Sequence, residues 1–426
     1  MDQKKIGGFI AALRKEKKLT QKVLAQMLGI SEKTVSKWEC GSGLPEVVYM
    51  EPLCDILGIT VNELLAGEHL HIAQLLYKLD MSRLELMKQL EFEQLKFRIY
   101  RLYGFEIESM EISDNGAGSL TYFVQADGKK YVVKYPSDNE MNHPELEPRL
   151  CEYLCAHGIP ACRFVKNLQK NVLSVDENGR RFHLQEFIEG KTYGYSKAPA
   201  FLLEQAPLLL ARIHEALRAF DGLPEGIGTM FFQHRRPEKM LDSFNASLQT
   251  ALSNGDRENA EDIRQIIRVL ERFPELHLHP EAFTYGNTHG DYTISQLLCG
   301  EHQINGIIDW TTACRHPLIW EVIRSYVFMA PECGEGRIDL DRFERYLRTY
   351  LRHGMLNTYD IENAGKLFFY FLAVCNFYGQ YYQSLTRNRD IFLKQAKLCK
   401  GIFLWLDSHM EELDLRLKVI ARTERR

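Results

Sequence analysis

The sequence predicts a multidomain protein in which an all-α bundle of short helices is followed by an α+β domain of two lobes, a small antiparallel sheet and a mostly helical remainder. Three observations support this prediction. In residues 1–68, short segments with apolar residues at helical spacing are separated by glycine. Residues 69–98 are rich in leucine and contain no proline or glycine. From Tyr103 apolar and polar residues alternate as in strands. Residues 1–68 are the expected helical bundle and residues 69–98 a connector. The smaller lobe of the second domain is expected at residues 99–188 and the mostly helical lobe at residues 189–426.

The composition indicates an ordinary globular chain. Its 426 residues are 45% hydrophobic, enough for two or three domains with cores of their own. No apolar run reaches the roughly 18 residues that cross a bilayer, and the first residues lack the charged, apolar and small-residue succession of a secretory leader. We therefore expect a cytoplasmic protein without membrane contact.

The ten cysteines have no regular framework spacing. Cys151, Cys155 and Cys162 are the closest group, and a metal site there is one interpretation. Reduced, half-buried thiols are the usual case in a cytosolic chain, so free thiols are the expectation.

Positive charge is concentrated at the front of the chain, although the whole sequence has a net charge of −4. Residues 1–40 contain nine Lys or Arg and four Asp or Glu, a local balance of +5. This sign is expected on a surface that faces phosphates, and a solvated helix face is the alternative.

Two short helices joined by a tight glycine turn follow the first helical stretch. Thr20 can cap the first of them and Ser31 the second, with Gly29 turning the chain between them. Val35 and Trp38 have the spacing of a buried face, which leaves the intervening polar side chains outward, where base edges and phosphates would lie. The pattern predicts a helix-turn-helix.

Residues 4–66 resemble the Cro/CI-type (XRE) helix-turn-helix family in three motifs, Leu19-Thr20-Gln21, Gly29-Ile30-Ser31 and Val35-Ser36-Lys37-Trp38-Glu39. The resemblance implies five helices, the third in the major groove of double-stranded DNA, and dimers that read two half-sites. Gln21 would hold a phosphate or a base, and Thr34 would lie close to the DNA backbone. The residues expected at the DNA are Gln21, Ser31, Glu32, Lys33, Thr34, Ser36 and Lys37. A small helical bundle that binds another protein is the alternative.

A long connecting helix is expected over residues 69–98. A heptad seam through Leu79 and Leu86 is interrupted by Arg83 and Glu93, which argues against a long coiled coil. We expect a connector that packs on the next domain, and a contribution to a homodimer stays open.

A β-hairpin and a helix are predicted next. Strand-like alternation surrounds a turn at Asp127-Gly128 and ends at Lys134. The loop before the hairpin, 115–119, consists of small residues that let backbone N–H groups approach a phosphate. Glu147 opens the following helix. A strand lysine held by a helix glutamate fixes phosphates in kinases, and an ordinary surface ion pair is the alternative.

A second group of motifs points to phosphoryl transfer. His289-Gly290-Asp291 follows a loop, Gln296 comes five residues after the aspartate, and an apolar strand delivers Asp309. Phosphoryl transfer needs one carboxylate to orient or deprotonate the attacking hydroxyl and a second carboxylate, with an amide-type ligand, to hold Mg²⁺ against the phosphates. The two aspartates meet that need.

On these motifs, and on Gln185-Glu186-Phe187-Ile188-Glu189-Gly190 and Leu210-Ala211-Arg212-Ile213-His214, residues 99–426 resemble the aminoglycoside phosphotransferase and choline kinase-like family. The resemblance implies a protein-kinase-like bilobal fold that binds ATP or GTP with Mg²⁺ and phosphorylates a small hydroxylated metabolite. Asp291 would be the catalytic aspartate and His289 would brace its loop. Asp309 and Gln296 would hold the metal. The nucleotide would contact Gly116, Gly118, Ser119, Lys134, Glu147 and the backbone at Glu186 and Ile188.

The chain departs from the family pattern at two places. Gln296 stands where the family has asparagine, which keeps a carbonyl ligand at a reach one methylene longer. After Asp309 the usual Asp-Pro pair is His316-Pro317, and a later family aspartate falls near Glu321. Both departures bear on whether the kinase-like part is active.

The phosphate acceptor is not encoded in these motifs. An aromatic-rich helix is expected over residues 368–382, and at helical spacing such a run is more often core than pocket. A pocket for a hydroxylated or cationic metabolite is the alternative, since aromatic faces attract cations.

Three functions therefore stay open. The first is a DNA-binding protein with an ATP-dependent small-molecule phosphotransferase domain that couples metabolite phosphorylation or sensing to transcription. The second is a transcriptional regulator whose kinase-like domain only senses ligand or nucleotide. The third is an antibiotic phosphotransferase with an incidental DNA-binding domain. The presence of Lys134, Glu147, Asp291 and Asp309 favours the first over the second.

Overall fold

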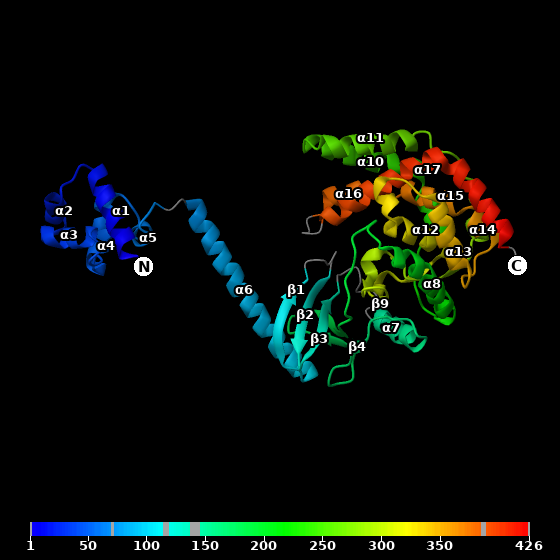
Figure 1. Cartoon of the computed structure of the whole chain (residues 1–426), viewed down its shortest axis with the longest axis horizontal. Helices are drawn as coiled ribbons and strands as arrows, with labels where there is room; N and C mark the ends of the chain where they lie inside the picture. The colour runs from blue at the N-terminus through cyan, green and yellow to red at the C-terminus, as the bar shows by residue number, and fades with distance from the viewer. Residues whose placement is uncertain (1, 70–71, 114–118, 137–144, 385–388, 425–426) are drawn as a thin grey trace. The chain divides into compact units, whose positions relative to one another are not determined.

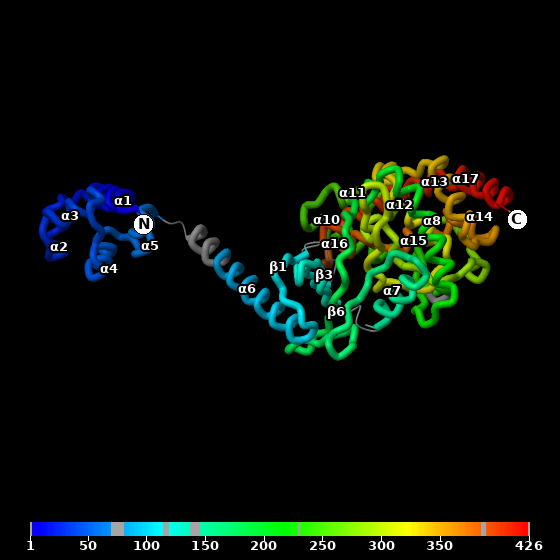
Figure 2. Tube along the Cα trace, turned by 60° about the horizontal axis from the view of Figure 1, so that its bottom comes forward, coloured from blue at the N-terminus to red at the C-terminus, as the bar shows by residue number. Residues whose placement is uncertain are grey.

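The computed structural model describes residues 2–69, 72–113, 119–136, 145–384 and 389–424, and only the backbone of residues 72–80 and 229–230. The chain separates into two compact units, Met1–Leu95 and Lys96–Arg426. Figure 1 shows the helices and strands of both units, and Figure 2 traces the same chain from another side.

The N-terminal unit begins with the five helices that were expected: α1 (Gln3–Glu16), α2 (Gln21–Leu28), α3 (Glu32–Glu39), α4 (Val47–Leu57) and α5 (Val61–Ala66). Thr20 and Ser31 cap α2 and α3 by accepting hydrogen bonds from backbone N–H groups. Gly29 ends α2 in the left-handed region, at φ 68°, where a side chain is unfavourable. Val35 and Trp38 are buried in the core of this unit, as predicted.

Helix α6 (Ile72–Tyr103) confirms the long helix and extends it beyond residue 98. Its last turns pack on the next domain. Ile99 is fully buried, and Arg98 donates Nη1 to the Tyr135 hydroxyl at 2.6 Å.

The smaller lobe of the C-terminal unit is an antiparallel sheet in the order β1-β2-β3-β6-β4, with β5 paired to β6. Its strands are β1 (Ile107–Ile112), β2 (Leu120–Ala126), β3 (Lys129–Tyr135), β4 (Phe164–Val165), β5 (Leu173–Val175) and β6 (Arg181–Glu186). The predicted hairpin is present, with Asp127 and Gly128 at φ 49° and 71° in its turn. Pairing of β3 with β6 sets Lys134 opposite His183, and α7 (Leu146–Ala156) follows as predicted.

The larger lobe is mostly helical. Its helices are α8 (Ala200–Ala216), α9 (Thr229–His234), α10 (Pro237–Ser253), α11 (Arg257–Leu270), α12 (Leu318–Met329), α13 (Leu340–Leu351), α14 (Thr358–Glu362), α15 (Ala364–Ala373), α16 (Phe377–Gln383) and α17 (Arg389–Thr423). Two antiparallel pairs of short strands accompany them, β7 (Tyr285–Thr288) with β10 (Cys314–Pro317) and β8 (Leu297–Cys299) with β9 (Ile304–Ile307). Helix α12 is buried along its whole length and lies inside this lobe, which makes it a rigid support for the loops around it.

The aromatic run over residues 368–382 forms two helices rather than the single helix expected. The Asn376 side chain accepts the Gly379 N–H and starts α16, which competes with continuation of α15. Phe368, Phe369 and Tyr378 are buried, in agreement with the core interpretation.

The predicted fold class, a helical bundle followed by an α+β bilobal domain, is confirmed. Among the described residues, no helix combines the length and the apolar character that a membrane span requires. The ten cysteines, Cys151, Cys155 and Cys162 included, are free thiols.

Candidate active site and DNA-binding surface

Lys134 of the sheet and Asp309 of the larger lobe meet in one ion pair. Lys134 Nζ donates to Asp309 Oδ1 at 3.0 Å, although the residues are 175 positions apart in the sequence. Asp309 follows β9 in a left-handed conformation, φ 63° and ψ 62°, and Thr311 Oγ1 donates to the same oxygen at 2.8 Å. Enclosure would raise the pKa of Asp309, but the charge and hydrogen bond of Lys134 and the Thr311 hydroxyl hold it below its ordinary value. Asp309 is therefore an ionised carboxylate tied to the sheet lysine.

Glu147, in the first turn of α7, belongs to the same cluster. Its Oε1 accepts the Trp310 backbone N–H at 3.2 Å, and its Oε2 lies 3.7 Å from His183 Nε2. Burial, together with the charge of Lys134, lowers the pKa of His183 to about 3, so the ring is neutral and this contact is not an ion pair. The structure thus gathers the sheet lysine, the helix glutamate and Asp309, while a direct bond between Lys134 and Glu147 stays a prediction.

The loop that carries Asp291 is fixed to the strand that precedes Asp309. His289 Nε2 donates to the Ile308 carbonyl at 3.1 Å, and the Asp291 N–H donates to His289 Nδ1 at 3.3 Å. Gly290, at φ 79°, has no room for a side chain, since a Cβ there would lie 2.0 Å from the Thr312 carbonyl oxygen. His289 lies where a bracing role requires it.

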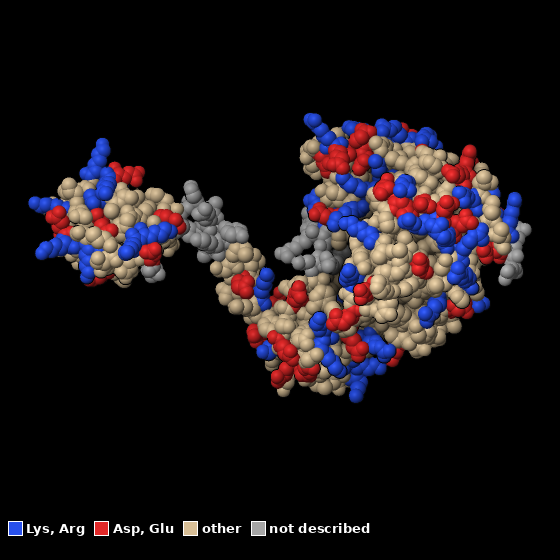
Figure 3. Space-filling model, viewed as in Figure 1, with Lys and Arg blue, Asp and Glu red and all other residues tan. Residues whose placement is uncertain are grey.

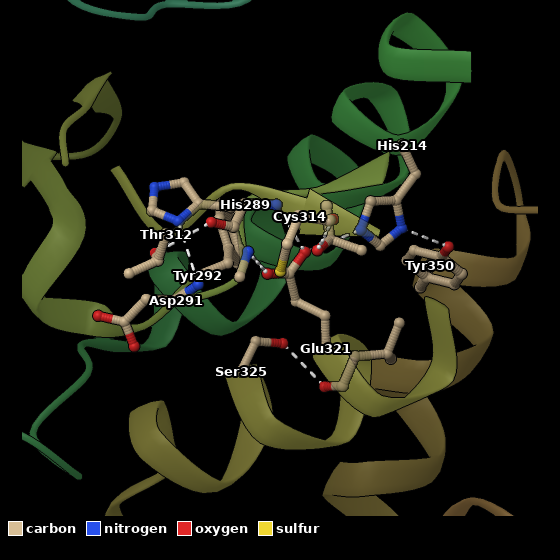
Figure 4. A network of polar contacts seen from close by, with 12 residues as sticks. His214, His289, Asp291, Tyr292, Thr312, Cys314, Glu321, Ser325 and Tyr350 are labelled. Carbon is tan, nitrogen blue, oxygen red and sulfur yellow. Dashed lines mark hydrogen bonds and ion pairs between the residues drawn. The ribbon is translucent and has the colours of Figure 1, made fainter. Parts of the chain in front are cut away.

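Glu321 holds the same loop from α12 (Figure 4). Its carboxylate accepts the backbone N–H groups of His289 at 3.2 Å and Gly290 at 2.6 Å. His214 Nε2 donates to it at 2.9 Å, and the Tyr350 hydroxyl lies 2.8 Å from His214 Nδ1. Burial would raise the pKa of Glu321, but the hydrogen bond and charge of His214 hold it below its ordinary value. A fully buried carboxylate therefore fixes the backbone of the Asp291 loop.

Both oxygens of Asp291 accept side-chain hydrogen bonds. Gln296 Nε2 donates to Oδ2 at 2.8 Å, and Arg324 Nη2 donates to Oδ1 at 2.5 Å. The Asp291 side chain is 26% exposed, so the carboxylate also faces solvent. Donation through the amide nitrogen leaves the amide oxygen of Gln296 as an acceptor.

The oxygen donors around Asp309 fit Mg²⁺. The Asp309 side chain is 39% exposed, and the Ile308 N–H donates to the Gln296 carbonyl at 3.0 Å, which sets Gln296 beside the start of the Asp309 turn. Mg²⁺ prefers one or two carboxylates completed by phosphate and water oxygens. Asp309 and the amide oxygen of Gln296 are the groups that could hold the ion.

The structure describes only some of the predicted nucleotide-binding residues. Gly116 and Gly118 lie outside the described residues, and Ser119 is a half-buried bend before β2. At the end of β6 the Glu186 N–H donates to the Arg163 carbonyl at 2.8 Å. In the part of the chain that the structure describes, the Ile188 N–H has no hydrogen-bond partner and can receive an adenine acceptor.

The outward face of α3 carries the predicted DNA-contacting side chains. Glu32, Lys33 and Lys37 are exposed, whereas Thr34 and Ser36 are half-buried. Figure 3 shows Lys and Arg side chains projecting from the N-terminal unit. These positions leave the α3 face open to a groove or to phosphates.

Three of the predicted DNA residues, Gln21, Ser31 and Thr34, make side-chain hydrogen bonds within the protein. The Ser31 hydroxyl accepts the Thr34 N–H at 3.2 Å, and Gln21 Nε2 donates to Glu39 Oε2 at 2.7 Å. Glu39 also pairs with Arg14 at 2.6 Å, and both side chains are at most 10% exposed. A hydrogen bond to Glu39 therefore holds Gln21 toward α3, and sequence reasoning did not foresee the ion pair of Glu39 with Arg14.

Sequence reasoning also missed Arg324, and it gave His214 and Glu321 no role in fixing the loop. A signal for Arg324 existed, because Glu321 and Arg324 are three residues apart on one helix and therefore share a face. The partners that each would meet are far away in the sequence, so spacing alone did not reveal them.

The fold and the site define a phosphotransferase of the kinase-like class with a helix-turn-helix head. Residues 110–356 match the family model described as a phosphotransferase enzyme family, which covers more than half of the chain, and residues 10–64 match a helix-turn-helix model. The chain therefore belongs to the phosphotransferase enzyme family.

The head is also similar to a curated protein, the HTH-type transcriptional activator BcrR of Enterococcus faecalis, with 41% identity over 58 residues. That match spans 14% of this chain and 28% of BcrR, so it concerns the head alone.

Two solved structures share the fold of the C-terminal unit. The spectinomycin phosphotransferase APH(9)-Ia, in complex with ADP and spectinomycin, has 17% identity and a TM-score of 0.50 over 75% of this chain and 98% of that chain. A microcompartment-associated aminopropanol kinase has 14% identity and a TM-score of 0.50 over 77% of this chain and 99% of that chain. At these identities the likeness concerns the fold.

Proposed function

We propose that this chain transfers the γ-phosphoryl group of ATP to a hydroxyl of a small metabolite, and that the state of this site controls how its helix-turn-helix head binds double-stranded DNA. The observation that carries the proposal is the contact between Lys134 and Asp309, set beside an Asp291 loop that His289 ties to the same strand. Phosphoryl transfer depends mainly on such positioning and on charge stabilisation.

Asp291 is proposed to orient the acceptor hydroxyl. In the proposed reaction the acceptor oxygen forms a bond to the γ-phosphorus, the bond to the bridging oxygen of ADP breaks, and the hydroxyl proton passes to the Asp291 carboxylate. The partly exposed carboxylate and its fixed backbone support this role.

Lys134 and Asp309 serve the nucleotide. The Lys134 ammonium neutralises phosphate charge, and the Ile188 N–H receives the base. Asp309 and Gln296 would hold Mg²⁺, which supplies charge neutralisation at the phosphate oxygens.

Replacing each aspartate separately tests these roles. Asp291→Asn is expected to keep Mg²⁺-ATP binding and to lose transfer by about 10²-fold or more, whereas Asp309→Asn is expected to weaken metal-dependent nucleotide binding as well. Calorimetric titration with ATP, with and without Mg²⁺, and a radiolabelled transfer assay measure the two effects. Gln296→Asn is the mild control because it retains the amide ligand.

Unchanged metal-dependent ATP binding in Asp309→Asn would show that the metal role is wrong. Unchanged transfer in Asp291→Asn would remove the catalytic role, and wild-type nucleotide binding without any transfer would favour a regulator that only senses its ligand.

The homodimer is proposed to form along α6. Leu86 and Leu90 lie one turn apart on this helix and are 67% and 60% exposed. A second copy that packs on them would bury both side chains and would bring two heads to adjacent half-sites. Sedimentation of the wild type against Leu86→Gln/Leu90→Gln measures this association.

A further inference from the structure

Arg324 is a buried cation beside the candidate catalytic carboxylate. It is 8% exposed, and its guanidinium carbon lies 4.6 Å from the Phe328 ring centroid and 5.4 Å from that of Trp320. Aromatic faces attract a cation but accept no conventional hydrogen bond. Nη2 donates to Asp291, whereas Nη1 has no hydrogen-bond partner among the described residues.

This arrangement does not serve stability well. A guanidinium has five N–H donors, and burying it with a single ion-pair partner leaves much of its hydration uncompensated. Burial would lower the pKa of Arg324, but the charge and hydrogen bond of Asp291 keep it above its ordinary value, so the cation persists. The Arg342 and Glu332 pair of the same lobe differs, because Arg342 is 40% exposed and remains hydrated.

The contact with Arg324 has two consequences for Asp291. Its carboxylate is held from opposite oxygens by donors on separate elements, Gln296 after the loop and Arg324 on α12, which fixes its rotation. The carboxylate and the guanidinium also form a pair of zero net charge. The Asp291 carboxylate therefore presents no uncompensated negative charge that would attract a cationic acceptor.

We propose that Arg324 is a positioning and specificity-determining residue: it sets the orientation of Asp291 toward the acceptor hydroxyl and directs the site to neutral or anionic hydroxyl compounds, against acceptors with an ammonium group next to the reacting hydroxyl. This inference rests on the proposed function of Asp291. It narrows the acceptor class, which the sequence left open.

The test uses the full-length chain with Arg324→Met, Arg324→Lys and the control Arg342→Met, which removes an arginine from an ion pair outside the site. Hydrolysis of Mg²⁺-ATP and transfer to glucose, gluconate and glucosamine are measured for each. Arg324→Met is expected to lower kcat about 10²-fold while the KM for ATP stays within about twofold. Arg324→Lys is expected to recover part of kcat, and Arg342→Met to match the wild type.

Acceptor preference gives the second readout. The wild type is expected to prefer glucose or gluconate to glucosamine, and Arg324→Met to shift the glucosamine-to-glucose ratio of kcat/KM upward by about tenfold. If the wild type is active and Arg324→Met has the same kcat and the same acceptor preference, the inference about Arg324 is wrong, whereas the proposed function still stands. A wild type with neither hydrolysis nor transfer would remove the proposed function, and the inference with it. If thermal denaturation shows that Arg324→Met does not fold, Arg324→Lys decides, because a wild-type kcat in that variant overturns the positioning role.

Discussion

At the scale of single residues, burial and the charge of Lys134 together keep the facing histidine, His183, neutral. His183 lies opposite Lys134 in the register of β3 and β6, and neither ring nitrogen has a hydrogen-bond partner among the described residues. Burial and the Lys134 charge lower the pKa of His183 to about 3. Protonating this ring in the folded state would add a second buried cation beside the first.

His183→Phe tests that description through stability against pH. The folded pKa lies below the ordinary value of 6.5, so the unfolded chain binds more protons between pH 6.5 and about 3, and stability falls as the pH falls through that window. One such group contributes a slope of up to about 1.4 kcal/mol per pH unit. In His183→Phe the free energy of unfolding, measured by urea titration from pH 7 to 4.5, is expected to decline less steeply.

The matched control is His302→Phe, whose parent side chain is 85% exposed and which is expected to leave the slope unchanged. Some slope persists in His183→Phe, because burial also lowers the pKa of His316 to about 4. Identical slopes in His183→Phe and the wild type would mean that His183 takes up its proton in the folded state as readily as in the unfolded one.

The site residues that sequence reasoning predicted, and that the structure brings together, lie inside short motifs. Asp291 and Asp309 were identified because each ends a local pattern with a known chemical use. Arg324 lies 33 positions from Asp291, and Arg14 lies 25 positions from Glu39, so both pairs form only through packing of separate elements. A buried arginine and an exposed one look the same in the sequence, which is why these contacts were not predicted.

At the scale of elements, α12 supports the loop that carries Asp291 through one carboxylate. Glu321 satisfies the backbone N–H groups of His289 and Gly290 and the ring of His214. His289 and His214 are buried and Gly290 is half-buried, so these donors have little access to water as an alternative acceptor. The position of the loop and the stability of the lobe therefore depend on the same side chain.

Glu321→Gln is expected to destabilise the protein by about 3 kcal/mol, since it removes a fully buried charge that three donors share. Urea denaturation measures the destabilisation, and transfer activity is expected to fall with it. The control is Glu335→Gln, whose side chain is 67% exposed and pairs with Arg337, with an expected change within about 0.5 kcal/mol. Equal effects of the two variants would contradict a supporting role for Glu321.

The exposed lysines of α3 lead to a prediction about DNA binding by the N-terminal helix-turn-helix. The double variant Lys33→Ala/Lys37→Ala is expected to bind the operator with reduced preference and to show a shallower salt dependence of DNA binding, by about 0.9 in log–log slope for each phosphate that the variant no longer neutralises. Fluorescence anisotropy at several salt concentrations, with duplexes from the protein's own promoter region, measures both. Lys17→Ala/Lys18→Ala removes the same charge from the end of α1 and serves as the control. An equal reduction of preference in the two double variants would remove the recognition role of α3.

Elements were predicted best where local signals agree. The caps at Thr20 and Ser31 and the Asp127-Gly128 turn each fix a boundary through backbone chemistry that a sequence displays directly. The break between α15 and α16 was not foreseen. It depends on the Asn376 side chain, which donates to Ser243 of α10 at 3.0 Å, a contact made only in the folded lobe.

At the scale of the whole molecule, two recognisable parts share one chain. A helix-turn-helix segment at residues 10–64 and a phosphotransferase segment at residues 110–356 flank α6, a helix that is continuous from Ile72 to Tyr103. In the C-terminal unit the last turns of α6 pack on the sheet that carries Lys134. In the proposed function, a change in that sheet on binding ATP would act on α6 through this contact.

Operator affinity, measured with and without saturating Mg²⁺-ATP and acceptor, tests whether the proposed phosphoryl-transfer site controls DNA binding. We expect the two affinities to differ by about 1–3 kcal/mol. DNA half-sites lie at fixed spacings of roughly 34–36 Å or multiples of that distance, so a change in the distance between two heads would change the affinity. A flexible glycine-serine insertion after Ser82 is expected to abolish the difference without affecting transfer. Equal operator affinities of the wild type in every ligand condition would contradict control of DNA binding by the phosphoryl-transfer site.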